Sequence, residues 1–121
     1  PVRFLGLPGE PFPELGIGYD EAWAFGEPQL EFGNPDPPDL AAAPTAPYLK
    51  EQLGGQMPVI VGLANDHVGY LVPAYDYKLD ERVPYWEEAD GDHYEETNSL
   101  GPRTVPDILE ACQKLFVWQP F

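Results

Sequence analysis

The feature that most constrains the fold of this chain is a run of three β-branched residues at positions 59–61. A short apolar run without alternation predicts a strand that is buried on both faces. Pro58 suits the first residue of such a strand, and Gly62 lets the backbone bend or approach another segment closely. Polar residues 65–67 follow, and open α/β sheets bind ligands beyond the ends of buried strands. We therefore expect any chemical centre to lie beside residues 58–73.

A second strand is predicted over residues 2–7, adjacent to the strand at 58–63 and parallel to it. The intervening chain would then form a long crossover, right-handed if the strands are parallel. The predicted fold class is α/β, with a partial mixed sheet and few helices. Its loops are long, because the chain contains 16 prolines and 12 glycines. We expect one incomplete domain over residues 1–121, a fragment of a larger α/β domain.

The clearest helix is predicted to follow Thr104, which is a good N-cap residue. One apolar stripe runs along it, and Glu110 can pair with Lys114 on its wet side. The stripe consists of Ile108, Leu109, Cys112, Leu115 and Phe116. Short helical turns are expected within 46–53 and 74–80. A hairpin-like segment is expected over 21–32, whereas Pro11 and Pro13 argue against a regular helix after the first strand.

The net charge of −15 argues against binding to nucleic acid or to anionic membranes. No apolar run is long enough to span a bilayer. The composition fits a soluble protein, secreted or cytoplasmic, and the single cysteine leaves the redox compartment open. The chain begins with Pro1 rather than methionine, so we expect a piece of a longer protein. A strand that is apolar on both faces needs covering, either by the remainder of the parent domain or by self-association.

Taken one at a time, the reactive side chains indicate no chemistry. Ser99 is the only serine and does not lie in a nucleophile elbow. Cys112 lies on the apolar stripe, which is typical of a core thiol. His67 and His93 lack the spacing of a metal-binding motif. Residues 90–92, Asp-Gly-Asp, lack the further acids of a calcium loop.

Three segments in order resemble the neutral (non-lysosomal) ceramidases and their uncharacterised bacterial relatives. Residues 7–12, Leu-Pro-Gly-Glu-Pro-Phe, are similar to the family's Pro-Gly-Glu-Phe-type motif. Residues 62–70 resemble its Gly-Leu-x-Asn-x-x-x-x-Tyr segment. Residues 94–102 resemble its Tyr-Glu-…-Ser-…-Gly-Pro segment, which a helix follows. A long proline-rich insertion separates the first two segments and makes the bacterial relatives the nearer ones.

The resemblance implies a zinc-dependent hydrolase that cleaves the amide of ceramide, with a lipid amide as substrate. In the family two histidines from earlier in the chain, a glutamate and a tyrosine hold the zinc ion. The glutamate carries over onto Glu10 and the tyrosine onto Tyr70. The family's histidines and serine lie upstream of this region. The chain would thus supply half of a zinc site, bind zinc weakly or not at all, and be inactive alone.

The alternative is a non-catalytic acidic α/β domain for interaction or cation binding, which keeps the family's frame without its chemistry. A calcium-binding module is a third reading. Metal-binding histidines upstream in the parent gene would favour the hydrolase over the interaction domain, and calcium titration would test the third reading.

Overall fold

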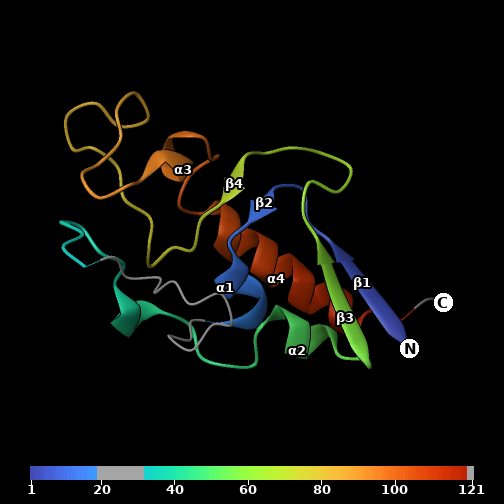
Figure 1. Cartoon of the computed structure of the whole chain (residues 1–121). Coiled ribbons are helices and arrows are strands. Elements are labelled where there is room, and N and C mark those ends of the chain that lie inside the picture. Colours follow the sequence, from blue (N-terminus) through green and yellow to red (C-terminus); the bar gives the residue numbers. More distant parts are fainter. Residues whose placement is uncertain (19–31, 120–121) are drawn as a thin grey trace.

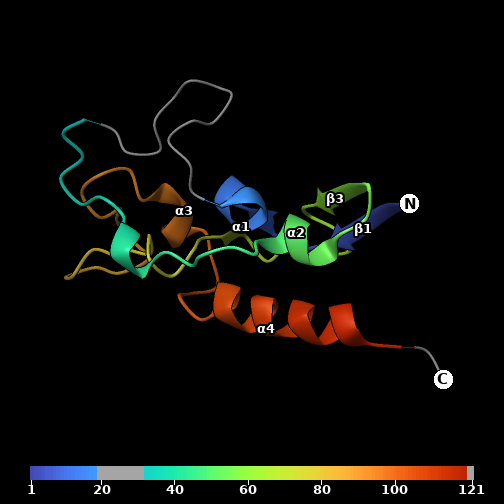
Figure 2. The ribbon, with the colours of Figure 1, turned by 90° about the horizontal axis from the view of Figure 1, so that it is seen from below.

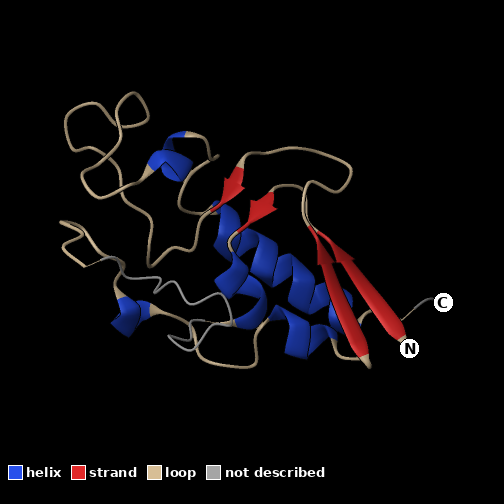
Figure 3. Ribbon diagram, in the orientation of Figure 1, coloured by secondary structure: helices blue, strands red, loops and turns tan. Residues whose placement is uncertain are grey.

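The computed structural model describes residues 1–18 and 32–119, and it combines short parallel strands with helices (Figures 1 and 3). The strands are β1 (Val2–Gly6), β2 (Glu10–Pro11), β3 (Met57–Val61) and β4 (Tyr70–Leu71). The helices are α1 (Pro13–Ile17), the 3-10 turn η1 (Leu40–Ala42), α2 (Leu49–Leu53), α3 (Tyr94–Thr97) and α4 (Thr104–Val117). The hairpin-like segment expected over 21–32 falls almost wholly outside the described residues.

Strands β1 and β3 pair in parallel, from Val2 opposite Met57 to Gly6 opposite Val61. This confirms the predicted pairing of the two apolar segments. In place of one mixed sheet, the described residues form two separate two-stranded parallel sheets, β1–β3 and β2–β4. The two strand segments bend after the β1–β3 pair, one at Pro8 and the other over residues 62–69. They then pair a second time as β2 and β4.

Helices α2 and α4 lie on the same side of β1–β3 (Figure 2). The core on that side is a cluster of buried residues drawn from strands and helices: Leu5, Leu7, Leu15, Leu49, Leu53, Leu71, Val105 and Cys112. In the described part of the chain no element covers the opposite face. There Phe4 is 68% exposed and Met57 is 59% exposed. The expectation that residues 59–61 are buried on both faces was therefore wrong, since Val61 remains 43% exposed.

A helix does follow the first strand pair, contrary to our expectation from Pro11 and Pro13. Pro13 occupies the start of α1, where a missing N–H costs nothing because that donor has no partner inside a helix. Leu15 then reaches the core and Gly18, with φ of 78°, ends the helix. A proline at the first helical position is therefore compatible with this helix.

Helix α4 confirms the helix predicted to follow Thr104, but it begins one residue earlier. Thr104 is the first helical residue and not the N-cap. The N-cap residue is Arg103, whose side chain makes no cap hydrogen bond. Lys114 Nζ lies 2.6 Å from Glu110 Oε1, as their spacing predicts. Cys112 is buried, whereas Leu115 on the predicted stripe is 62% exposed.

Of the two short helical turns predicted, the structure contains one. Helix α2 confirms the helical turn expected within 46–53. Residues 74–76 form a turn and not a helix. None of the helices in the described ranges has the length and apolarity needed to cross a membrane.

Candidate metal site

Glu10 and Tyr70 are direct partners in the parallel ladder of β2 and β4. Residues at matching positions of two neighbouring strands project to the same face of the sheet. The negative charge of Glu10 is the largest cause that raises the pKa of the Tyr70 phenol, followed by desolvation and by Tyr94 and Glu95. The structure thus brings together the two residues that the sequence singled out.

The backbone holds these strands together through the segments that precede them. Five hydrogen bonds join residues 7–10 to residues 61–69: Leu7 N to Val61 O at 2.9 Å, Leu63 N to Gly9 O at 2.9 Å, Ala64 N to Leu7 O at 2.8 Å, Val68 N to Pro8 O at 2.8 Å and Glu10 N to Gly69 O at 3.0 Å. They set the position of Glu10 relative to Tyr70 without any help from side chains.

Glycines make this close approach feasible. A Cβ atom added at Gly9 would lie 2.5 Å from the carbonyl oxygen of Gly69, and one at Gly62 would lie 2.7 Å from Cδ of Pro11. Contacts this short do not occur between real side chains and their neighbours. The sequence prediction that Gly62 permits a close approach of two segments is confirmed.

The third segment also reaches this site. The backbone N–H of Tyr70 donates to the carbonyl oxygen of Asn98 at 3.1 Å. The ring of Tyr94, at the start of α3, meets the ring of Tyr70 edge to face with centroids 6.0 Å apart. All three segments that carry the family resemblance therefore lie together.

Glu10 and Tyr70 could supply at most two ligands to a metal ion. A structural or catalytic zinc ion takes three or four protein ligands, and these two residues offer a carboxylate and a phenol oxygen. In the part of the chain that the structure describes, no three His, Cys, Asp or Glu side chains converge to hold a metal ion. His67 is exposed in the loop before β4, whereas both ring nitrogens of His93 have hydrogen-bond partners.

The other reactive side chains have structural surroundings. Ser99 Oγ lies 2.7 Å from the hydroxyl of Tyr77 and donates to the carbonyl oxygen of Glu96 at 3.0 Å. Cys112 is buried in the core, and burial raises the pKa of its thiol.

A buried charged cluster was not foreseen from the sequence. His93 Nδ1 lies 2.7 Å from Glu96 Oε1, and the two side chains are 4% and 2% exposed. Burial lowers the pKa of His93, but its hydrogen bond to Glu96 and the charge of Glu96 raise it above the ordinary value overall. For the two nearby acids burial acts in the other direction, because it disfavours the charged carboxylate. It raises the pKa of Asp76 to about 6 and that of Glu14 to about 7. Nothing in the sequence marks Glu14 as a buried acid, because it is a single acid between Pro13 and Leu15.

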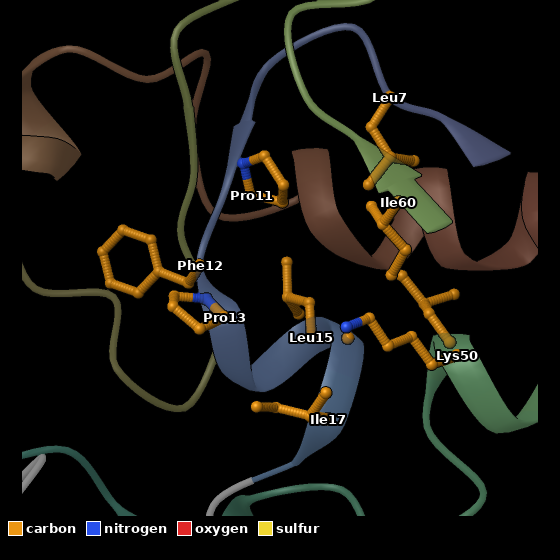
Figure 4. A pocket seen from close by; sticks show the side chains of 10 residues that line it. Leu7, Pro11, Phe12, Pro13, Leu15, Ile17, Lys50 and Ile60 are labelled. Carbon is orange, nitrogen blue, oxygen red and sulfur yellow. The ribbon is translucent and has the colours of Figure 1, made fainter. Parts of the chain in front are cut away.

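An apolar cavity of about 190 Å³ lies beside the end of β2. Figure 4 shows Pro11 and Phe12 on one side of it, α1 below and Ile60 of β3 opposite. Lys50 is the one charged side chain in its lining. Pro11 projects to the face of β2 opposite to that of Glu10, so the cavity lies on the other face from the Glu10–Tyr70 pair.

Comparison of the chain with protein-family models, with curated proteins and with solved structures gave no match. The family resemblance therefore depends on the three sequence segments.

Proposed function

We propose that the chain is the C-terminal portion of the catalytic domain of a neutral-ceramidase-like zinc amidohydrolase, and that Glu10 and Tyr70 are two ligands of its metal. The observation that carries the proposal is the pairing of these two residues at matching positions of β2 and β4. In this reading the two short strand pairs belong to a larger α/β sheet, which the rest of the domain completes.

Each residue has a defined part in such a site. Zinc, when bound, would polarise the amide carbonyl of the substrate and lower the pKa of an attacking water molecule. Glu10 supplies the anionic ligand. Tyr70 must give up its proton to bind as a phenolate, and the neighbouring charge of Glu10 raises the pKa of that phenol. We therefore expect the affinity of this pair for zinc to rise with pH.

A lipid amide is the proposed substrate class. This substrate class rests on the resemblance of the three sequence segments. The cavity lined by Pro11 does not support it, because Pro11 projects to the face of β2 opposite to that of Glu10.

The proposed partner is the remainder of the same catalytic domain, or a second copy of the chain. Parallel sheets have both faces covered in almost all known proteins. Phe4 and Met57 lie on the face of β1–β3 that no described element covers. A layer supplied by the parent domain would bury them and bring the remaining zinc ligands.

The test uses the protein that the full reading frame encodes. Its zinc content and its hydrolysis of an N-acyl amide are measured for the native form, Glu10→Ala and Tyr70→Phe, with the exposed Glu81→Gln as control. We expect Glu10→Ala to abolish both zinc binding and hydrolysis. Tyr70→Phe should reduce hydrolysis and leave the fold intact, and Glu81→Gln should change neither.

Full activity in both site variants would overturn the proposal. A reading frame without upstream histidines would also contradict it and favour a non-catalytic acidic domain for interaction or cation binding. The abundance of carboxylates in the chain, with a net charge of −15, supports that second candidate. Calorimetric titration of the chain with calcium would then measure its capacity for cations.

A further inference from the structure

The segment that contains α3 holds β4 from the side opposite β2. The N–H of Tyr70 donates to the carbonyl oxygen of Asn98 at 3.1 Å, while Tyr70 also pairs with Glu10 in the ladder. A Cβ atom added at Gly69 would lie 2.0 Å from that same carbonyl oxygen. The backbone around Tyr70 is therefore confined between two neighbours and has little room to shift.

The side chain of Tyr70 has its own neighbour in Tyr94. The two rings meet edge to face, with centroids 6.0 Å apart and planes inclined by 72°. Edge-to-face packing is the preferred arrangement of aromatic pairs, because the positive ring edge faces the negative ring face. It restricts the rotamers of Tyr70, which the backbone contacts alone do not.

Helix α3 needs an anchor to present Tyr94 in this way. Its four residues are too few for a stable helix in water. The anchor is buried: Nδ1 of His93 bonds Glu96 Oε1 at 2.7 Å, and Nε2 of His93 lies 3.1 Å from the carbonyl oxygen of Asp36. The N–H of Lys78 donates to the same Glu96 oxygen at 3.1 Å. Contacts from two distant loops thus fix the helix that carries Tyr94.

From these contacts we infer that Tyr94 is a positioning residue for Tyr70. The ring of Tyr94 selects the rotamer of Tyr70 that directs the Tyr70 phenol oxygen toward Glu10. The inference rests on the proposed function in naming zinc as the group that the two residues serve. It gives a role to the third sequence segment, which supplies no metal ligand of its own.

The test is made on the protein that the full reading frame encodes, with carbon-13-labelled tyrosine rings. Three-bond couplings report the χ1 rotamer of Tyr70, and ring-to-ring Overhauser effects report its contact with Tyr94. We expect one χ1 rotamer in the native chain and in Tyr94→Phe, which keeps the ring. Tyr94→Ala should show averaged couplings, and Trp86→Ala, which removes an exposed ring elsewhere, should not.

Zinc titration by calorimetry then separates this inference from the proposed function. Tyr94→Ala should weaken zinc binding by roughly threefold to tenfold, the size expected for one aromatic pair, and Tyr94→Phe should restore it. If Tyr70 loses its single rotamer in Tyr94→Ala but the protein that the full reading frame encodes binds no zinc at Glu10, the positioning role stands and the proposed function fails. If zinc binds there and Tyr94→Ala leaves both the rotamer and the affinity unchanged, the positioning role is overturned and the proposed function stands.

Discussion

At the scale of single residues, the pair Glu10 and Tyr70 gives a direct electrostatic signature. Glu10 is the largest cause that raises the pKa of Tyr70, so Glu10→Gln should lower that pKa toward the ordinary tyrosine value. The measurement is an alkaline titration of labelled tyrosine rings by NMR, with the Tyr70 signal assigned through Tyr70→Phe. Glu81→Gln removes an exposed carboxylate elsewhere and should leave the Tyr70 signal in place. An unchanged pKa in Glu10→Gln would mean that the two side chains do not face each other.

Glu14 predicts a second effect at the same scale. Burial raises its pKa to about 7 from an ordinary 4.5, with a smaller contribution from Asp76. A carboxyl group with a raised pKa in the folded state is protonated in both states below pH 4.5 and destabilises the fold as pH rises through 7. Glu14→Gln should therefore increase the free energy of unfolding by about 2 kcal/mol at pH 8 and change it little at pH 4. Urea titrations at the two pH values measure this, and an equal effect at both would contradict it.

At the scale of elements, the position of Tyr70 depends on the contact of β4 with the end of α3. Gly69 has φ of 88°, and a Cβ atom there would lie 2.0 Å from the carbonyl oxygen of Asn98. Gly69→Ala should lower the free energy of unfolding by about 3 kcal/mol, from backbone strain and the clash together. Gly33→Ala is the matched control, because Gly33 has φ of 86° and nothing within 4 Å; strain alone should cost about 1 kcal/mol. Equal urea midpoints for the two variants would show that β4 and α3 are not in contact.

The elements that the sequence predicted are those with a local signal. The β-branched run of β3 and the apolar stripe of α4 indicate their own structures, and the strand pairing follows from them. Helix α1 was missed because a proline at the first helical position looks like a helix breaker. Helix α3 has four residues and is held by buried contacts of His93 and Glu96 with distant loops, so no periodicity could indicate it. The pairing of Glu10 with Tyr70 was expected only through a family resemblance, since an acid in a turn and a strand tyrosine carry no signal when taken alone.

At the scale of the whole molecule, the open face of β1–β3 predicts association. Phe4, 68% exposed, lies there opposite Val59 of the neighbouring strand. Phe4→Ser should reduce self-association in sedimentation experiments and binding of a hydrophobic dye, while the free energy of unfolding changes by less than about 0.5 kcal/mol. Leu100→Ser removes an equally exposed side chain away from the sheet and should leave association unchanged. A chain that is monomeric, binds no dye and melts cooperatively would contradict the expectation that a partner covers the open face of β1–β3.

The most direct measurement of the central claim is a zinc titration of the protein that the full reading frame encodes. NMR follows it at three places: the Tyr70 phenol carbon, the Glu10 carboxyl carbon and the His67 ring. Zinc should shift the Tyr70 and Glu10 signals together, with one midpoint that falls as pH rises. In Glu10→Gln the shift at Tyr70 should disappear, and His67 should respond weakly and independently. A zinc response confined to His67, or the absence of any change at Tyr70 at saturating zinc, would contradict the claim that Glu10 and Tyr70 are ligands of one metal ion.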